Sequence, residues 1–140
     1  MTSTSKHRYT VELRISGKEL LPSVITEEME LQPTNMRQAG ERRGASSVFT
    51  EGSWSFAGAD MKEWDSLEAG LSSLMNELLP KKWLISGYAN RFDVCWWCAH
   101  FQDSFDGGPT FSPGLLRSLA EFGIGLFLDN YVSAESGSEN

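Results

Sequence analysis

The sequence predicts an α+β fold, a two-layer sandwich in which a mostly antiparallel sheet of about five strands carries three helices on one face. Three stretches support this prediction. Residues 9–15 alternate between apolar and polar side chains, as a half-buried strand does. Residues 64–79 repeat apolar side chains at helical spacing, and residues 111–131 combine a helix, a glycine cap and a strand. The expected order of elements is βαβαββαβ, which is compatible with a ferredoxin-like arrangement.

The chain is expected to form one domain. Its 140 residues match the usual length of a single domain. We assign the α+β domain to residues 8–132. We expect residues 1–7 and 133–140 to be loose termini, because both ends are polar.

The N-terminal half contains one clear strand and several weaker patterns. The first strand ends at Gly17. Pro22 is suited to open a short helix that places Val24, Ile25 and Met29 on the core side and is stopped by Pro33. Carboxylates cluster near the C-terminal end of this helix, where the helix dipole disfavours them, so we expect it to be weak. Residues 34–52 show little periodicity and predict a long loop. Residues 53–57 alternate again and predict a short second strand.

The middle of the chain carries the strongest helical pattern, over residues 64–79. Gly70 weakens this helix by about 1 kcal/mol relative to alanine, and Pro80 is expected to end it. Residues 83–88 predict a third strand and residues 92–98 a fourth. Only a short turn separates them, so we expect an antiparallel hairpin.

The C-terminal unit begins with Ser112, a residue type that caps helices, followed by Pro113 at the first helical position. Gly123 stands where a left-handed C-cap is expected. The strand at residues 124–128 is expected to pair with the N-terminal strand or with the strand at residues 92–98, so the C-terminal unit closes the sheet.

Composition and charge exclude several functions. Hydrophobic residues make up 40% of the chain, and the formal net charge is −7. An acidic chain argues against nucleic-acid binding, which favours a basic surface, and it permits a basic protein partner. Two cysteines cannot build a disulfide scaffold. The sequence shows neither a secretory signal pattern nor an apolar run long enough for a membrane helix, so we expect a cytoplasmic protein.

Four pieces of sequence occur in an order that resembles a known family. They are the strand VELRISG at residues 11–17, the LQPT segment at residues 31–34, a polar stretch with Gly40 before Trp54, and the block from Phe111 to Tyr131. The ordered set resembles the bacterial family called domain of unknown function 4279. The resemblance implies a small, intracellular, single-domain bacterial protein and no assigned activity. Families of this kind often include proteins encoded near toxins, which favours an immunity role.

The two cysteines form a C-x-x-C pattern, Cys95 and Cys98. A redox site of this type needs a helix N-terminus, whereas these cysteines lie inside a predicted strand. Residues i and i+3 of a strand point to opposite faces. We therefore interpret both as buried structural thiols.

The histidines are His7 and His100. His100 follows the predicted fourth strand and precedes Asp103 and Asp106, so it is a candidate base or metal ligand. No nucleophile motif accompanies it. We predict no catalytic residue, no metal site and no cofactor.

The favoured functional hypothesis is a non-enzymatic protein-interaction domain of the immunity type, with a basic protein or a second copy as partner. Trp96 and Trp97 are adjacent on a predicted strand, so one of them faces away from the other. If a sheet face is uncovered there, it exposes an apolar patch. The predicted interface residues are Trp96, Trp97, Cys95 and Phe101.

Two other hypotheses stay open. Arg37, Arg42 and Arg43 lie in the long predicted loop and could bind an anion, which suits a small-molecule-binding protein or an enzyme. Alternatively, the chain is a homodimeric domain that buries the Trp97 face and has no separate ligand.

Overall fold

The computed structural model describes residues 7–59 and 62–133. Of the termini predicted to be loose, residues 1–6 and 134–140 lie outside the described part. The prediction is wrong for His7, which is the first residue of β1 and whose side chain contacts His100. The strands are β1 (His7–Gly17), β2 (Asn35–Arg37), β3 (Gly52–Phe56), β4 (Asp93–Gln102) and β5 (Gly125–Val132). The helices are α1 (Pro22–Met29), α2 (Leu67–Leu78), the 3-10 turn η1 (Leu79–Lys81), α3 (Lys82–Tyr88) and α4 (Pro113–Phe122).

The predicted α+β class and five-stranded sheet are confirmed. The strand order is β2-β3-β1-β4-β5, and every neighbouring pair is antiparallel except β4 and β5. The C-terminal strand thus pairs with the Trp96 strand, one of the two pairings expected. Because β4 and β5 are neighbours, the sheet differs from the ferredoxin-like arrangement, in which another strand separates them.

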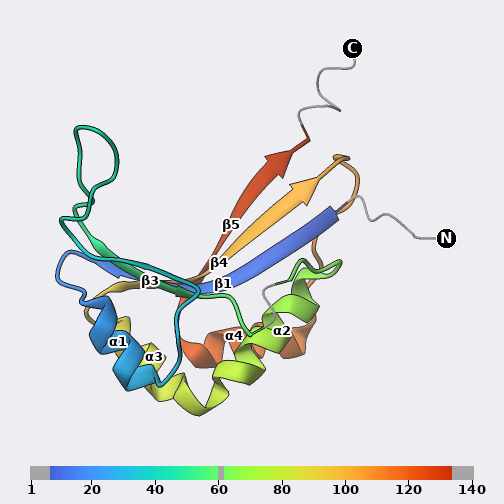
Figure 1. Cartoon of the computed structure of the whole chain (residues 1–140). Helices are drawn as coiled ribbons and strands as arrows, with labels where there is room; N and C mark the ends of the chain where they lie inside the picture. Colours follow the sequence, from blue (N-terminus) through green and yellow to red (C-terminus); the bar gives the residue numbers. More distant parts are fainter. Residues whose placement is uncertain (1–6, 60–61, 134–140) are drawn as a thin grey trace.

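The helices lie on one face of the sheet and leave the other face uncovered (Figure 1). The covered face holds one core, because β1 places every second side chain on it. Trp54 and Trp96 are fully buried there. The core residues that the strands and helices share are Tyr9, Val11, Leu13, Ile15, Ile25, Met29, Phe56, Leu71, Leu74, Leu78, Ile85 and Phe122.

The two ends of α4 follow the sequence prediction. The Ser112 hydroxyl accepts a hydrogen bond from the Leu115 amide at 3.1 Å, and Gly123 adopts φ 72°, the left-handed conformation that glycine tolerates. Glu68 of α2 stabilises the N-terminus of α4. Its carboxylate accepts hydrogen bonds from the Ser112 amide and hydroxyl, both at 2.7 Å. These bonds hold the pKa of Glu68 below its usual value.

The predicted strand at residues 83–88 is wrong, because this segment forms α3. Ile85 and Tyr88, three positions apart, are buried, whereas Trp83 is 81% exposed, so the burial period is helical. The helix α2 ends at Leu78, just before Pro80 as predicted. Pro80 lies in the first positions of η1, where no amide hydrogen is needed, so a new helical segment follows. The hairpin expected between residues 83–88 and 92–98 is therefore absent from the described chain.

The long loop predicted at residues 34–52 is also corrected. It contains β2, and residues 38–51 form a hairpin that projects from the uncovered face of the sheet (Figure 1). Arg42 and Val48 form a β-bridge. The Gly40 amide donates to the Phe49 carbonyl at 2.8 Å. Gly40 has φ 97°, which a larger residue rarely adopts.

Candidate functional site

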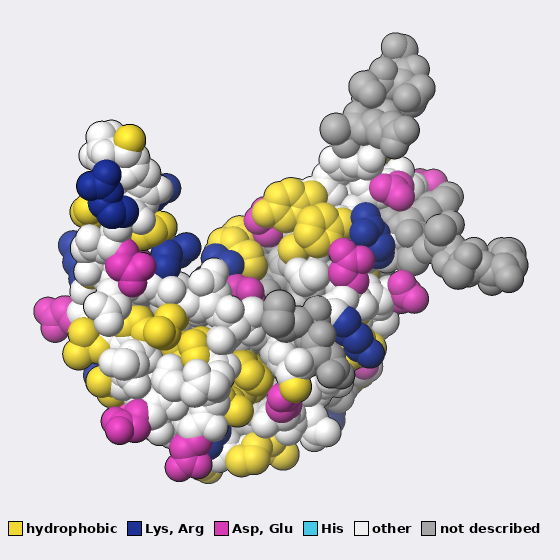
Figure 2. Space-filling view, in the orientation of Figure 1, with side chains coloured by type: hydrophobic (Ala, Val, Ile, Leu, Met, Phe, Trp, Pro, Cys, Tyr) yellow, Lys and Arg dark blue, Asp and Glu magenta, His cyan; other side chains and the backbone are white. Residues whose placement is uncertain are grey.

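The uncovered face of the sheet carries a row of aromatic side chains, which we call the aromatic ridge: Trp97, Phe101, Phe127 and Tyr131. Register explains the row, because Trp97 lies opposite Phe127, and Phe101 opposite Tyr131, on the parallel strands β4 and β5. The ring centroids are 4.3 Å apart in the first pair and 5.1 Å in the second. Phe127 is 45% exposed and Tyr131 47%. Figure 2 shows hydrophobic side chains gathered over these strands.

Arginines of β1 cover part of the ridge. The Cζ atom of Arg14 lies 3.7 Å from the centroid of the Trp97 ring, close enough for a cation–π contact. The Nη2 and Nε atoms of Arg14 also contact Oε2 of Glu12 at 2.8 and 2.9 Å. Arg8 lies 5.8 Å over Phe101 and pairs with Glu63 at 3.2 Å. Both β1 arginines therefore already have a carboxylate partner.

This face also carries two further arginines, Arg37 at the end of β2 and Arg43 in the hairpin at residues 38–51. The Cζ atom of Arg37 lies 4.2 Å from the centroid of Phe49, and that of Arg43 lies 5.7 Å from the same ring. Neither arginine forms an ion pair with another described residue. The Nε atom of Arg37 is buried and has no hydrogen-bond partner within the described chain.

Between the hairpin and the ridge lies a hollow of about 320 Å³, which we call the arginine hollow. Figure 2 shows the depression between the projecting hairpin and the hydrophobic side chains over β4 and β5. Its lining residues are Arg14, Ser16, Arg37, Arg43, Phe49, Thr50, Glu51, Gly52, Ser53 and Trp97. The hollow thus combines three guanidinium groups, three hydroxyl side chains and two aromatic rings.

The structure separates the predicted interface residues. Trp97, Cys95 and Phe101 lie on the uncovered face, since they alternate along β4 and stand opposite outward-facing residues of β1. Trp96 is completely buried, with its ring edge-on to Phe122 at 5.2 Å. The assignment of Trp96 to an interface is therefore wrong, because the side chain belongs to the core.

The predicted arginine cluster is also divided. Arg37 and Arg43 line the hollow, whereas Arg42 does not and instead donates a hydrogen bond to the Ala45 carbonyl at 3.3 Å. Sequence reasoning missed Arg14 and Phe49. The signal for Arg14 was available, since it occupies a polar position of the alternating first strand.

The two cysteines are free thiols, Cys95 half-buried and Cys98 buried. Burial raises the pKa of Cys98 to about 12 and also raises the pKa of Cys95. Both thiols are therefore protonated at neutral pH, which makes them poor nucleophiles and poor metal ligands.

The two histidines meet near one end of the adjacent inner strands β1 and β4. Nδ1 of His7 lies 2.8 Å from Nε2 of His100, and Nδ1 of His100 lies 2.8 Å from Oδ1 of Asn130. Nε2 of His7 is 2.6 Å from the carbonyl oxygen of Asp106, so this nitrogen donates. His100 is 3% exposed and stacks on Tyr9 at 4.6 Å. Within residues 7–59 and 62–133, no group of three or more metal-ligating side chains comes together.

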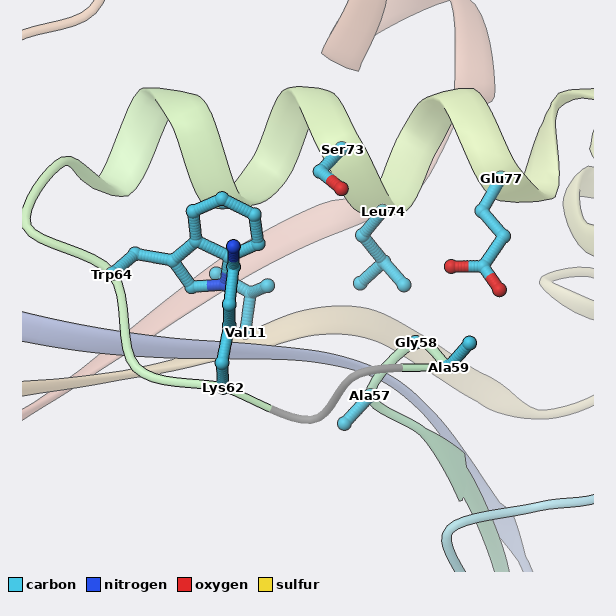
Figure 3. Close-up of a pocket in the computed structure, with 10 residues that line it drawn as sticks. Val11, Ala57, Gly58, Ala59, Lys62, Trp64, Ser73, Leu74 and Glu77 are labelled. Carbon is cyan, nitrogen blue, oxygen red and sulfur yellow. The ribbon is translucent and has the colours of Figure 1, made fainter.

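A smaller pocket, of about 110 Å³, lies beside α2 (Figure 3). The Lys62 ammonium lies 4.4 Å over the Trp64 ring at one end, and the Glu77 carboxylate points toward the Gly58 turn at the other. Its charged groups stand apart and do not converge on one point, so we regard the arginine hollow as the better candidate site.

The fold and this face define a small α+β domain with an open, arginine- and aromatic-lined sheet surface. A family model described as Domain of unknown function (DUF4279) matches residues 7–133. The chain therefore belongs to this family. No curated protein and no solved structure matches it. None of the described helices is long and apolar enough to cross a membrane.

Proposed function

We propose that this protein is a non-enzymatic interaction domain that binds a partner protein on the uncovered face of its sheet. The aromatic ridge is the observation that carries the proposal. Four aromatic rings in paired contact, two of them nearly half exposed, form an apolar patch on a face without a second layer. Such patches mark interaction surfaces, because burying aromatic side chains supplies much of the binding free energy of interfaces.

The charges on this face indicate the chemistry of the partner. Arg37 and Arg43 have no carboxylate partner among the described residues, and they flank the ridge beside Arg14. We therefore propose that the partner presents acidic side chains next to apolar ones. An immunity role, in which the partner is a toxin, is the most concrete version of this proposal. A basic partner, suggested by the net charge of −7, would have to use another surface.

Site-specific photo-crosslinking in living cells tests the proposal. A photoreactive residue at Phe127, on the ridge, is compared with one at Trp83, which is 81% exposed on α3 in the helix layer. We expect a discrete adduct from position 127 and none from position 83. The partner identified in the adduct is then purified, and its affinity is measured by calorimetry against the wild type and Phe127→Ala. Loss of a central aromatic anchor should weaken binding at least about tenfold.

Two results would overturn the proposal. Equal adducts from both positions mean that the ridge has no special affinity, and no adduct from position 127 means that the ridge has no partner in the cell. An adduct of two copies of this chain favours the homodimer alternative instead, and light scattering of the purified protein then gives the oligomeric state.

A further inference from the structure

We infer that the arginine hollow is a binding site for the phosphate monoester group of a small molecule. This inference does not depend on the protein partner proposed above, although both use the same face of the sheet. It concerns the cavity between the hairpin at residues 38–51 and the sheet.

The hollow offers two guanidinium groups that have no other anionic partner. Arg37 and Arg43 form no ion pair with the described residues, while Arg14 is occupied by Glu12. Guanidinium groups bind phosphate through paired N–H donors. The Nε atom of Arg37 is buried and has no hydrogen-bond partner among the described residues, so this guanidinium is not fully satisfied within the chain.

Charge favours a phosphate monoester over a single carboxylate. The pair of Glu12 and Arg14 shows that one guanidinium satisfies one carboxylate on this face. Two further guanidinium groups match a group that carries a charge of nearly −2 at neutral pH. The lining also contains one opposing carboxylate, that of the exposed Glu51, which should weaken the binding of any anion.

Hydroxyl groups stand beside the arginines. Ser53 lies opposite Arg37 on β2 and opposite Ser16 on β1, so the three side chains share the uncovered face in one row. Thr50 adds a third hydroxyl to the lining. Hydroxyls donate to phosphate oxygens without adding charge, and they complete the set of donors that a tetrahedral oxyanion needs.

The arginines are held in position before a ligand arrives. Phe49 lies against both Arg37 and Arg43, at 4.2 and 5.7 Å, and backbone hydrogen bonds of Phe49 to Gly40 and Glu41 fix the hairpin that carries this ring. Preorganised donors lose less conformational entropy on binding. At about 320 Å³ the hollow can also hold part of a molecule larger than inorganic phosphate.

Isothermal titration calorimetry of the full chain in low-salt buffer tests the site with three probes: inorganic phosphate, adenosine monophosphate and adenosine. We expect both phosphate-bearing probes to bind and adenosine not to bind. The double variant Arg37→Gln/Arg43→Gln should lose at least about tenfold in affinity. Arg42→Gln is the control, because it removes one positive charge from the hairpin that carries Arg43, but from a side chain outside the hollow. Its affinity should stay within about twofold of the wild type.

Glu51→Gln provides a test that a damaged fold cannot imitate. Removing the opposing carboxylate should tighten phosphate binding several-fold, because like-charge repulsion is lost. Thermal unfolding of each variant without ligand confirms that the fold is kept.

Several outcomes would overturn the inference. They are no binding of either phosphate probe at about 5 mM, equal binding of adenosine and adenosine monophosphate, equal losses in Arg42→Gln and the double variant, or no gain in Glu51→Gln. A positive crosslink at Phe127 combined with no phosphate binding removes this inference and leaves the proposed interaction function intact.

Discussion

Gly70 of α2 offers the sharpest test of how this core is packed. By helix propensity alone, Gly70→Ala should stabilise the protein by about 1 kcal/mol. The structure predicts the opposite sign. A Cβ atom at Gly70 would lie 2.9 Å from Cδ1 and 3.0 Å from Cγ of Trp64. The backbone of Trp64 is held by two hydrogen bonds with Tyr9, each of 2.8 Å, so the ring cannot withdraw freely.

The expected magnitude follows from these two opposing effects. Overpacking of this kind costs about 1–3 kcal/mol, which exceeds the propensity gain over most of its range. We expect Gly70→Ala to lower the free energy of unfolding by up to about 2 kcal/mol. Gly87→Ala is the matched control, because Gly87 lies in α3 and a Cβ atom there meets nothing within 4 Å. That variant should gain about 0.5–1 kcal/mol.

The free energy of unfolding of both variants is measured by urea denaturation followed by circular dichroism. If the dependence of this free energy on urea concentration is the same as in the wild type, a shift of the midpoint reports a change in stability. A double-mutant cycle with Trp64→Leu should remove most of the cost of Gly70→Ala, since the contacting ring is gone. A stabilising effect of Gly70→Ala equal to that of Gly87→Ala would refute the packing argument.

Two further predictions concern the C-terminal unit. The pKa of Glu68 is lowered in the folded protein because Ser112 donates hydrogen bonds to its carboxylate. The stabilisation from these bonds is therefore complete above the pKa of an unfolded glutamate, about 4.3. It is lost as the pH falls through the lower pKa that Glu68 has in the folded protein. Glu68→Gln should therefore be less stable than the wild type at pH 7, with the difference shrinking toward pH 3 in acid titrations of the midpoint. A fragment of residues 1–120 lacks Phe122 and β5, and it should be unfolded by circular dichroism; a folded, soluble fragment would contradict the closing role of β5.

Secondary structure was predicted correctly where the apolar residues of a segment followed a single periodicity or where the residues at its ends were of a helix-capping type. Residues 9–15 alternate strictly, and Ser112 and Gly123 are residue types that caps require, so these elements could be predicted from local chemistry. Residues 83–88 could not, because a short apolar run fits a buried strand or a helix equally well. The three-residue strand β2 carries no usable pattern, since an edge strand of this length is mostly exposed.

The candidate site was only partly predictable for a different reason. The run from Arg37 to Arg43 predicted an anion site, and Trp97 predicted an aromatic face, but nothing in the sequence placed them beside each other. Arg14 reaches the site through the register of β1 against β4, where it stands opposite Cys95. Long-range pairing of this kind depends on strand order, which periodicity does not contain.

Net charge was the least informative guide to this face. The carboxylates that make the chain acidic include Glu27 and Glu28 of α1, in the helix layer, whereas Arg37 and Arg43 stand on the opposite side of the sheet. Charges farther apart than about 8 Å are largely screened at physiological ionic strength. A group in contact with the two arginines therefore experiences their field far more strongly than that of the helix layer. It follows that an anionic ligand can bind here although the whole chain carries a charge of −7.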